Sequence, residues 1–106
     1  MAFKFADYEY DKMEELDGAE KVSISQIVDK PGIITFYKEV GEDDNKRCFV
    51  RFKLDNGEDV FIYTGAKKIV TMLARIYESE GLIPALPVKI VAYPTKNGEG
   101  YKLTDA

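Results

Sequence analysis

Apolar and polar residues alternate along several short stretches of the chain, which is the pattern of half-buried β-strands. Residues 33–40, IITFYKEV, form two rows: Ile34, Phe36 and Val40 on one side, and Thr35, Tyr37 and Glu39 on the other. Residues 47–54, RCFVRFKL, alternate in the same way, as do 58–64, EDVFIYT, and 87–93, PVKIVAY. A last strand is predicted at YKLT, residues 101–104, and the polar runs GEDDNK and PTKNGEG predict loops.

The period changes from two to about 3.6 in AKKIVTMLARIYES, residues 66–79, where the apolar positions are Ile69, Met72, Leu73 and Ile76. This spacing predicts an amphipathic helix with Thr64 or Gly65 as its cap and Gly81 at its end. In residues 21–32, Ser23 or Ser25 is suited to cap one or two helical turns before Pro31, and a strand through Val22 and Ile24 is the competing interpretation.

The connection between residues 47–54 and 58–64 fixes how these two strands pair. A two-residue turn at Asn56-Gly57 would place Arg51 opposite Ile62 and mix charged with core positions. A three-residue loop, Asp55 to Gly57, with a left-handed Gly57 shifts the pairing by one and separates the faces. The core face then pairs Phe52 with Val60 and Val50 with Ile62, and the other face pairs Phe49 with Tyr63, Arg51 with Phe61, and Lys53 with Asp59. We therefore predict the three-residue loop.

The predicted order is strand, strand, strand, helix, strand, strand, which is the order of the five-stranded Greek-key barrel known as the OB-fold. We expect a mainly β protein with one or two helices and an OB-fold-like barrel over residues 21–106, preceded by an acidic, aromatic arm over residues 1–20. An open sheet with one packed helix and an SH3-like barrel are the alternatives with the same order.

Composition excludes most catalytic machinery. The chain of 106 residues has one cysteine and no histidine, so the usual zinc sites and any Ser-His or Cys-His pair are ruled out, and no pair of carboxylates is set apart by its spacing. We predict a protein that is not an enzyme and needs no cofactor or metal, with Cys48 buried in the core. No signal peptide or apolar run of membrane-spanning length is found, so an intracellular protein is expected.

Charge is distributed unevenly. The net charge is −4, but the first 20 residues hold seven acids and two lysines, so the remaining 86 carry 13 basic and 12 acidic residues. Within that nearly neutral body, one side of residues 47–54 is a cationic row with one aromatic ring, and the paired strand adds two more rings. Bases stack on aromatic rings while cations track phosphates, so this face is a candidate single-stranded nucleic-acid site. Its candidate residues are Arg47, Phe49, Arg51, Lys53, Phe61 and Tyr63, with Tyr37 if the first strand pairs it with Arg51 or Phe49, and Lys67 and Lys68 at the helix start.

Structural roles compete with this interpretation. Aromatic residues on the outside of a small barrel also pack under a terminal arm, and Arg51 over Phe61 is an ordinary cross-strand pair. Lys67 and Lys68 more often belong to a solvated helix turn.

Three segments carry a family resemblance: VSISQIVDKPGIITFY, FKLDNGEDVFIYTGAKKIVTML and LPVKIVAYPTKNGEGYKL, within residues 22–104. Together they resemble small single-stranded DNA-binding proteins of phages of Gram-positive bacteria, most closely at Tyr63-Thr64-Gly65. The resemblance implies a cytoplasmic accessory protein of phage or mobile-element DNA replication or recombination. It would coat single-stranded DNA, or RNA, without strong sequence preference, as a homodimer or cooperative array. The acidic arm would then recruit replication proteins and compete with DNA for the basic face.

The rival hypothesis is a protein-interaction module that inhibits a host enzyme. The same aromatic face would then be a protein-binding hot spot, because protein interfaces also favour aromatic residues and arginine. The acidic arm is the second surface that such a module would use.

Overall fold

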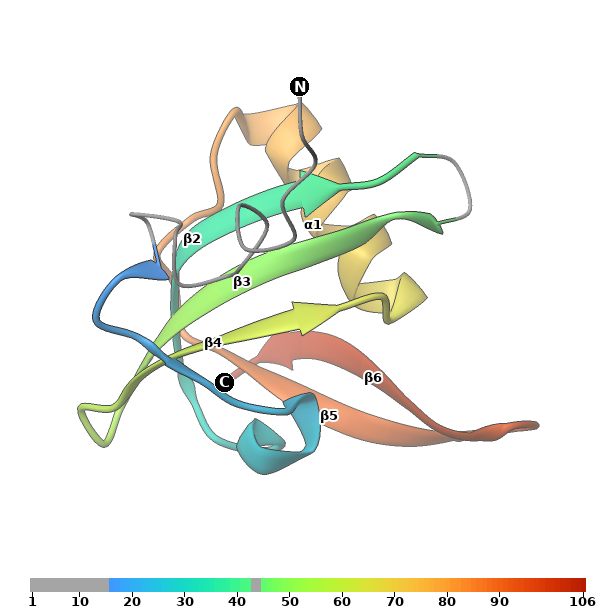
Figure 1. Ribbon diagram of the computed structural model, residues 1–106, viewed down its shortest axis with the longest axis horizontal. Coiled ribbons are helices and arrows are strands. Elements are labelled where there is room, and N and C mark those ends of the chain that lie inside the picture. Colours follow the sequence, from blue (N-terminus) through green and yellow to red (C-terminus); the bar gives the residue numbers. More distant parts are fainter. Residues whose placement is uncertain (1–15, 43–44) are drawn as a thin grey trace, which may run out of the picture.

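The computed structural model describes residues 16–42 and 45–106, which form one curled sheet with a helix against it (Figure 1). The strands are β1 (Glu20–Lys21), β2 (Gly32–Val40), β3 (Arg47–Leu54), β4 (Asp59–Thr64), β5 (Val88–Thr95) and β6 (Gly98–Asp105). A 3₁₀ helix, η4 (Ile24–Ile27), precedes β2, and α1 (Lys67–Glu80) lies between β4 and β5. The order in the sheet is β1-β4-β3-β2-β5-β6, with β1 parallel to β4 and the other pairs antiparallel. The mainly β class with one long helix is confirmed.

The sheet curls into a half-barrel. β2 pairs with β3 along its length but with β5 only at Gly32, so the sheet bends sharply there and the β5–β6 hairpin turns away from β3 and β4. A Cβ on Gly32 would lie 2.6 Å from the carbonyl oxygen of Lys53, so no larger residue fits this bend without a shift of backbone. The five long strands and the helix follow the predicted order of a partly open OB-like barrel.

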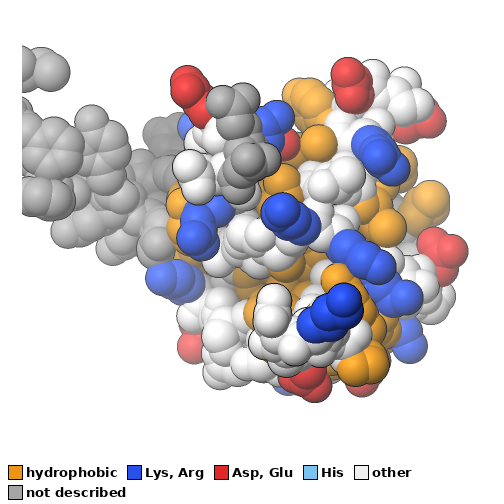
Figure 2. Space-filling view, turned by 90° about the vertical axis from the view of Figure 1, so that its right-hand side faces the viewer, with side chains coloured by type: hydrophobic (Ala, Val, Ile, Leu, Met, Phe, Trp, Pro, Cys, Tyr) orange, Lys and Arg blue, Asp and Glu red, His pale blue; other side chains and the backbone are white. Residues whose placement is uncertain are grey.

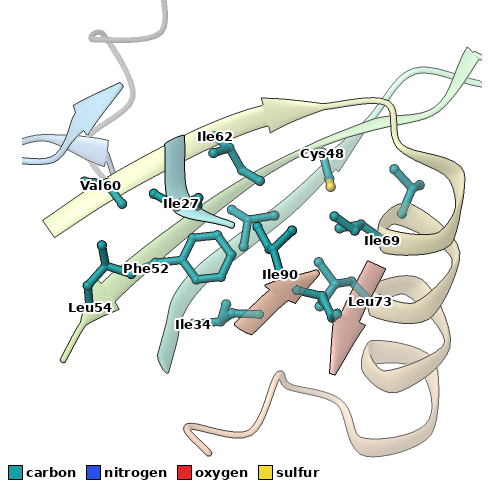
Figure 3. Close-up of a cluster of buried hydrophobic side chains, with 13 residues drawn as sticks. Ile27, Ile34, Cys48, Phe52, Leu54, Val60, Ile62, Ile69, Leu73 and Ile90 are labelled. Atoms are coloured by element: carbon teal, nitrogen blue, oxygen red, sulfur yellow. The ribbon is translucent and has the colours of Figure 1, made fainter. Parts of the chain in front are cut away.

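The core fills the space between the sheet and α1 (Figure 3). Ile69 and Leu73 of α1 have no exposed surface and meet Ile90 of β5, while β3 and β4 contribute their inward residues. Cys48 also lies in this cluster, as predicted, and burial with the nearby Glu39 raises the pKa of its thiol to about 12. Because the thiolate is the reactive form, Cys48 is an inert core residue at neutral pH.

The β3–β4 hairpin has the predicted register. Phe52 lies opposite Val60, Val50 opposite Ile62, and on the other side Phe49 opposite Tyr63. Gly57 has a φ of 92°, a backbone conformation that residues with a Cβ rarely adopt, and its N–H donates to the carbonyl of Leu54 at 2.9 Å. The rule that core and polar faces must separate therefore predicted both the loop and the pairing.

The sequence prediction for β2 was wrong beyond Ile34, because a bulge at Thr35 shifts the register. Phe36 then lies opposite Arg51 and Tyr37 opposite Val50, so the two rings have exchanged sides relative to strict alternation. Tyr37 packs against the main core with its ring 6.0 Å from that of Tyr77, and burial raises the pKa of its phenol above the usual range. The condition under which Tyr37 would join the aromatic face is not met.

α1 begins one residue later than predicted and ends at the predicted glycine. Its N-cap is Ala66, which has no capping side chain, and the hydroxyl of Thr64 instead accepts a hydrogen bond from the N–H of Ala66 at 3.0 Å. Gly81 closes the helix in the left-handed conformation, with a φ of 74°. Within the described residues, no helix has both the length and the apolar character needed to cross a membrane.

The two ends of the described chain are more ordered than the sequence predicted. Ser23 caps η4, and its N–H donates to the side chain of Gln26 at 2.8 Å, so the helical alternative is correct for this segment. β1 was not predicted, and the residues from Leu16 onward, assigned above to the arm, pack on the sheet. Residues 1–15 of the predicted arm lie outside the described residues. The final hairpin turns at residues 96–97, so both of its strands are longer than predicted.

Candidate nucleic-acid interface

The candidate residues of β3 and β4 share the side of the sheet turned away from α1, which we call the outer face. Residues opposite one another in an antiparallel pair point to the same side, so the register brings Arg51 beside Phe61 and Lys53 beside Asp59. β2 adds Phe36, Lys38 and Val40, which lie opposite Arg51, Phe49 and Arg47. The structure thus brings together the predicted residues of β3 and β4 and replaces Tyr37 by Phe36.

The rings at the centre of the outer face are covered. Phe49 is 7% exposed and Phe61 4%, and both pack against Leu16, which is itself 2% exposed. Ala19, Phe36, Val40 and Tyr63 surround this second hydrophobic cluster. Sequence analysis gave packing under the N-terminal arm as the alternative to nucleic-acid binding for these aromatic residues. The structure shows this packing for Phe49 and Phe61.

Arg51 is bound in an ion pair rather than presented to solvent. Its Nε and Nη2 donate to the two carboxylate oxygens of Asp59 at 2.8 and 2.6 Å. The pair is diagonal across the strands, because Asp59 lies opposite Lys53 in the register. The hydrogen bonds from Arg51 hold the pKa of Asp59 below its usual value and raise that of Arg51. Lys53, the other cation on this side of β3, is more exposed than Arg51.

This ion pair gives the protein a predicted acid sensitivity. The pKa of Asp59 is lower in the folded state, so its contribution to stability is present above the unfolded-state pKa and is lost as the pH falls through the folded pKa. Asp59→Asn should lower the free energy of unfolding by up to about 1 kcal/mol at pH 7, and by less below pH 4. Urea unfolding at pH 7 and pH 3 measures this, with Glu99→Gln on β6 as the exposed control. An equal loss at both pH values would contradict it.

Tyr63 lies at the border between the covered rings and the solvent. The centroid of its ring is 4.6 Å from the centroid of the Phe49 ring. The guanidinium carbon of Arg47, an exposed residue, lies 5.8 Å from the centroid of the Tyr63 ring. Gly65 adjoins this arginine: a Cβ there would lie 3.4 Å from the Cγ and Nη1 atoms of Arg47. Tyr63 is half-buried, in contrast to the buried Phe49 and Phe61, and its ring lies beside a cation.

A second cation–aromatic cluster, which sequence reasoning missed, lies where α1 meets the β5–β6 hairpin. The ammonium of Lys68 lies 4.5 Å from the centroid of the Tyr93 ring, and that of Lys102 lies 5.7 Å from it. The ring covers Gly100, where a Cβ would lie 2.5 Å from the Cζ atom of Tyr93, so this packing requires a glycine at position 100. The one sequence signal for this cluster is a tyrosine, Tyr93, opposite a glycine, Gly100, in the final hairpin. That hairpin is far from α1 in the sequence.

Both clusters belong to one end of the barrel, which we call the end face. Here β2 and β4 end, β3 and α1 begin, and the β5–β6 turn lies (Figure 1). Viewed from this end, lysine and arginine side chains spread across the surface and acidic ones lie mainly at its periphery (Figure 2). The exposed cations of these segments are Lys46, Arg47, Lys67, Lys68, Lys96 and Lys102.

The described residues of the end face present cations and aromatic rings. In the part of the chain that the structure describes, no three cysteine or acidic side chains are grouped to bind a metal ion. Lys46 is paired with Glu39 at 3.3 Å, whereas Arg47, Lys67 and Lys68 add exposed positive charge to this face. Such a surface attracts polyanions.

Comparison with known proteins identifies the family but not an activity. Neither the curated proteins nor the solved structures give a match. A family model described as a domain of unknown function, DUF8468, matches residues 18–104, which include every described strand and helix except the final residue of β6. Because the match spans most of the chain, this protein belongs to the DUF8468 family.

Proposed function

We propose that this protein binds single-stranded DNA without strong sequence preference, through the end face and the adjoining edge of the outer face. The observation that carries the proposal is the half-buried ring of Tyr63 between Phe49 and Arg47, with a second ring, Tyr93, beside Lys68. Rings on which bases stack, interleaved with cations that contact phosphates, are the elements of sequence-tolerant single-strand recognition. The family resemblance described above favours a role in phage or mobile-element DNA replication or recombination.

The individual residues contribute unequally in this proposal. Arg47, Lys67 and Lys68 are exposed and supply phosphate contacts, whereas the charge of Arg51 is already matched by Asp59. Tyr63 supplies the stacking surface, and Phe49 and Phe61 support it from below. Lys53 extends the positive charge along β3.

A single titration tests the proposal. The chain has seven tyrosines and no tryptophan, so stacking of bases on Tyr63 and Tyr93 should quench its intrinsic fluorescence. Oligo-dT should quench it and duplex DNA of equal phosphate concentration should do so far less. Oligo-U tests RNA in the same assay. Absence of quenching by any single strand at low salt would refute the proposal.

The alternative is a protein-interaction module, and one observation favours it. Phe49 and Phe61 already bind an apolar side chain, that of Leu16, which is how a protein hot spot holds a peptide. If the outer face binds a partner protein, DNA should not quench the tyrosine fluorescence. Replacing Leu16 by a polar residue should then uncover Phe49 and Phe61 for the partner.

A further inference from the structure

A shallow groove runs along α1 beside β6, next to the end face but on the helix side of the molecule. The described residues that line it include four cations and no acid: Lys67, Lys68, Arg75 and Lys102. Thr71 contributes a hydroxyl, and Met72 and Ile76 contribute apolar surface between the cations. The groove is therefore positively charged along its length without a built-in counter-ion among these residues.

The sequence of α1 explains why the charge lies on one flank. Lys68, Thr71 and Arg75 are separated by three and four residues, so they lie above one another on one flank, over about 10 Å of helix axis. The depression on the other flank, beside β2, is lined by a mixture of charges, with Lys38 and Lys46 matched by Glu39 and Glu78. The helix thus separates a cationic flank from a mixed one.

The cationic groove is continuous with the end face. Lys68 and Lys102 line the groove and also flank the ring of Tyr93. Lys67 follows directly after Gly65 and Ala66, and Gly65 adjoins Arg47. A polyanion that crosses the end face from Tyr63 to Tyr93 therefore reaches Arg75 without passing an acidic residue of the groove lining.

We propose that this groove binds the phosphate backbone of single-stranded DNA, so that the strand leaves the end face and continues along α1. The inference rests on the proposed function and extends it: the bound length is set by the helix as well as by the sheet. Met72 is 38% exposed and supplies an apolar surface for a base between Lys68 and Arg75. The direct continuity with the two ring clusters favours DNA over an acidic protein segment as the occupant.

The test uses the full-length variant Arg75→Ala, which removes the groove cation that is not part of the end face, with Lys30→Ala as the matched control. Lys30 is an exposed cation in the connection between η4 and β2, outside the groove and the end face. Loss of one phosphate contact should make the plot of log K against log salt on long oligo-dT less steep by about 0.7, the contribution of each contact to a single strand. The occluded length on poly-dT should also shorten, while short oligo-dT binds the variant within about twofold of wild type.

The outcomes separate the two proposals. An Arg75→Ala variant with the slope and occluded length of the wild type would overturn the groove and leave single-strand binding at the end face intact. If the wild type does not bind oligo-dT, the proposed function fails and the groove falls with it. Poly-glutamate that displaces long oligo-dT from the wild type at equal charge concentration, but not from the Arg75→Ala variant, would assign the groove to an acidic protein and overturn the DNA proposal.

Discussion

Replacing Tyr63 by alanine is expected to weaken binding to oligo-dT by about 5- to 150-fold, because stacking of one base on an aromatic ring contributes about 1–3 kcal/mol. Tyr63 is half-buried, whereas Phe49 and Phe61 are covered. The loss should appear as a vertical shift of the plot of log K against log salt with little change in slope, because no charge is removed. Anisotropy of a labelled oligonucleotide is the suitable readout, since the variant lacks one of the fluorescent rings.

Two variants control for this result. Tyr63→Phe keeps the ring and should bind within about twofold of wild type, and Tyr77→Ala removes a ring that is 52% exposed on α1, away from the end face. Thermal melting of each variant separates a binding defect from a folding defect, because Tyr63 also packs against Phe49. Wild-type affinity in Tyr63→Ala, or an equal loss in Tyr77→Ala, would contradict the assigned role.

Removing residues 2–17 is expected to tighten binding to single-stranded DNA by about tenfold at low salt, with the gain declining as salt increases. These residues contain six acids and two lysines, a net charge of −4. They are joined to the outer face through Leu16, which covers Phe49 and Phe61. The deletion removes negative charge that competes with phosphate and also uncovers two rings, and it leaves the family-matched residues 18–104 in place.

A matched pair of deletions separates the two effects. Deleting residues 2–15 removes most of the acids but keeps Leu16, whereas deleting 2–17 also exposes the rings of Phe49 and Phe61. If charge alone competes, both deletions tighten binding and the advantage disappears at high salt. If Leu16 blocks stacking, the longer deletion keeps part of its advantage at high salt. Unchanged or weaker affinity in both would contradict competition by the arm.

Local rules were sufficient to predict most of the fold. The register of β3 and β4 followed from separating Phe52 and Val60 from Arg51 and Lys53, because a shift of one residue would reverse every side chain. The end of α1 followed from Gly81, whose left-handed conformation suits a residue without a Cβ. These features depend on neighbours in sequence or on a single short loop.

The missed features depend on contacts that sequence spacing does not contain. Strict alternation predicted Tyr37 on the outer face. A bulge at Thr35 inserts one residue, so each side chain of β2 beyond it points to the opposite side of the sheet. The predicted β5–β6 hairpin was too short, because Pro94 and two glycines are typical of loops. Among the described residues, β5 pairs with β2 only at Val88, so the far half of β5 has a free edge on which a proline is tolerated.

The candidate site was predicted in composition but not in accessibility. The pattern placed Phe49, Arg51, Phe61 and Tyr63 on one face, as observed. It did not indicate that Leu16 covers two of the rings or that Asp59 pairs with Arg51. Both contacts join residues that strand alternation does not place opposite one another. The cluster of Tyr93 with Lys68 was missed for the same reason, since 25 positions separate the two in the chain.

The salt dependence of oligo-dT binding by the full-length protein tests the central claim most directly. Intrinsic tyrosine fluorescence is followed during titration at several salt concentrations, starting at low salt. Binding by the end face predicts quenching and a linear decrease of log K with log salt, with a slope of about −0.7 for each phosphate that Arg47, Lys67, Lys68 and their neighbours neutralise. Absence of quenching at low salt, or an affinity that does not change with salt, would contradict single-strand binding by this surface.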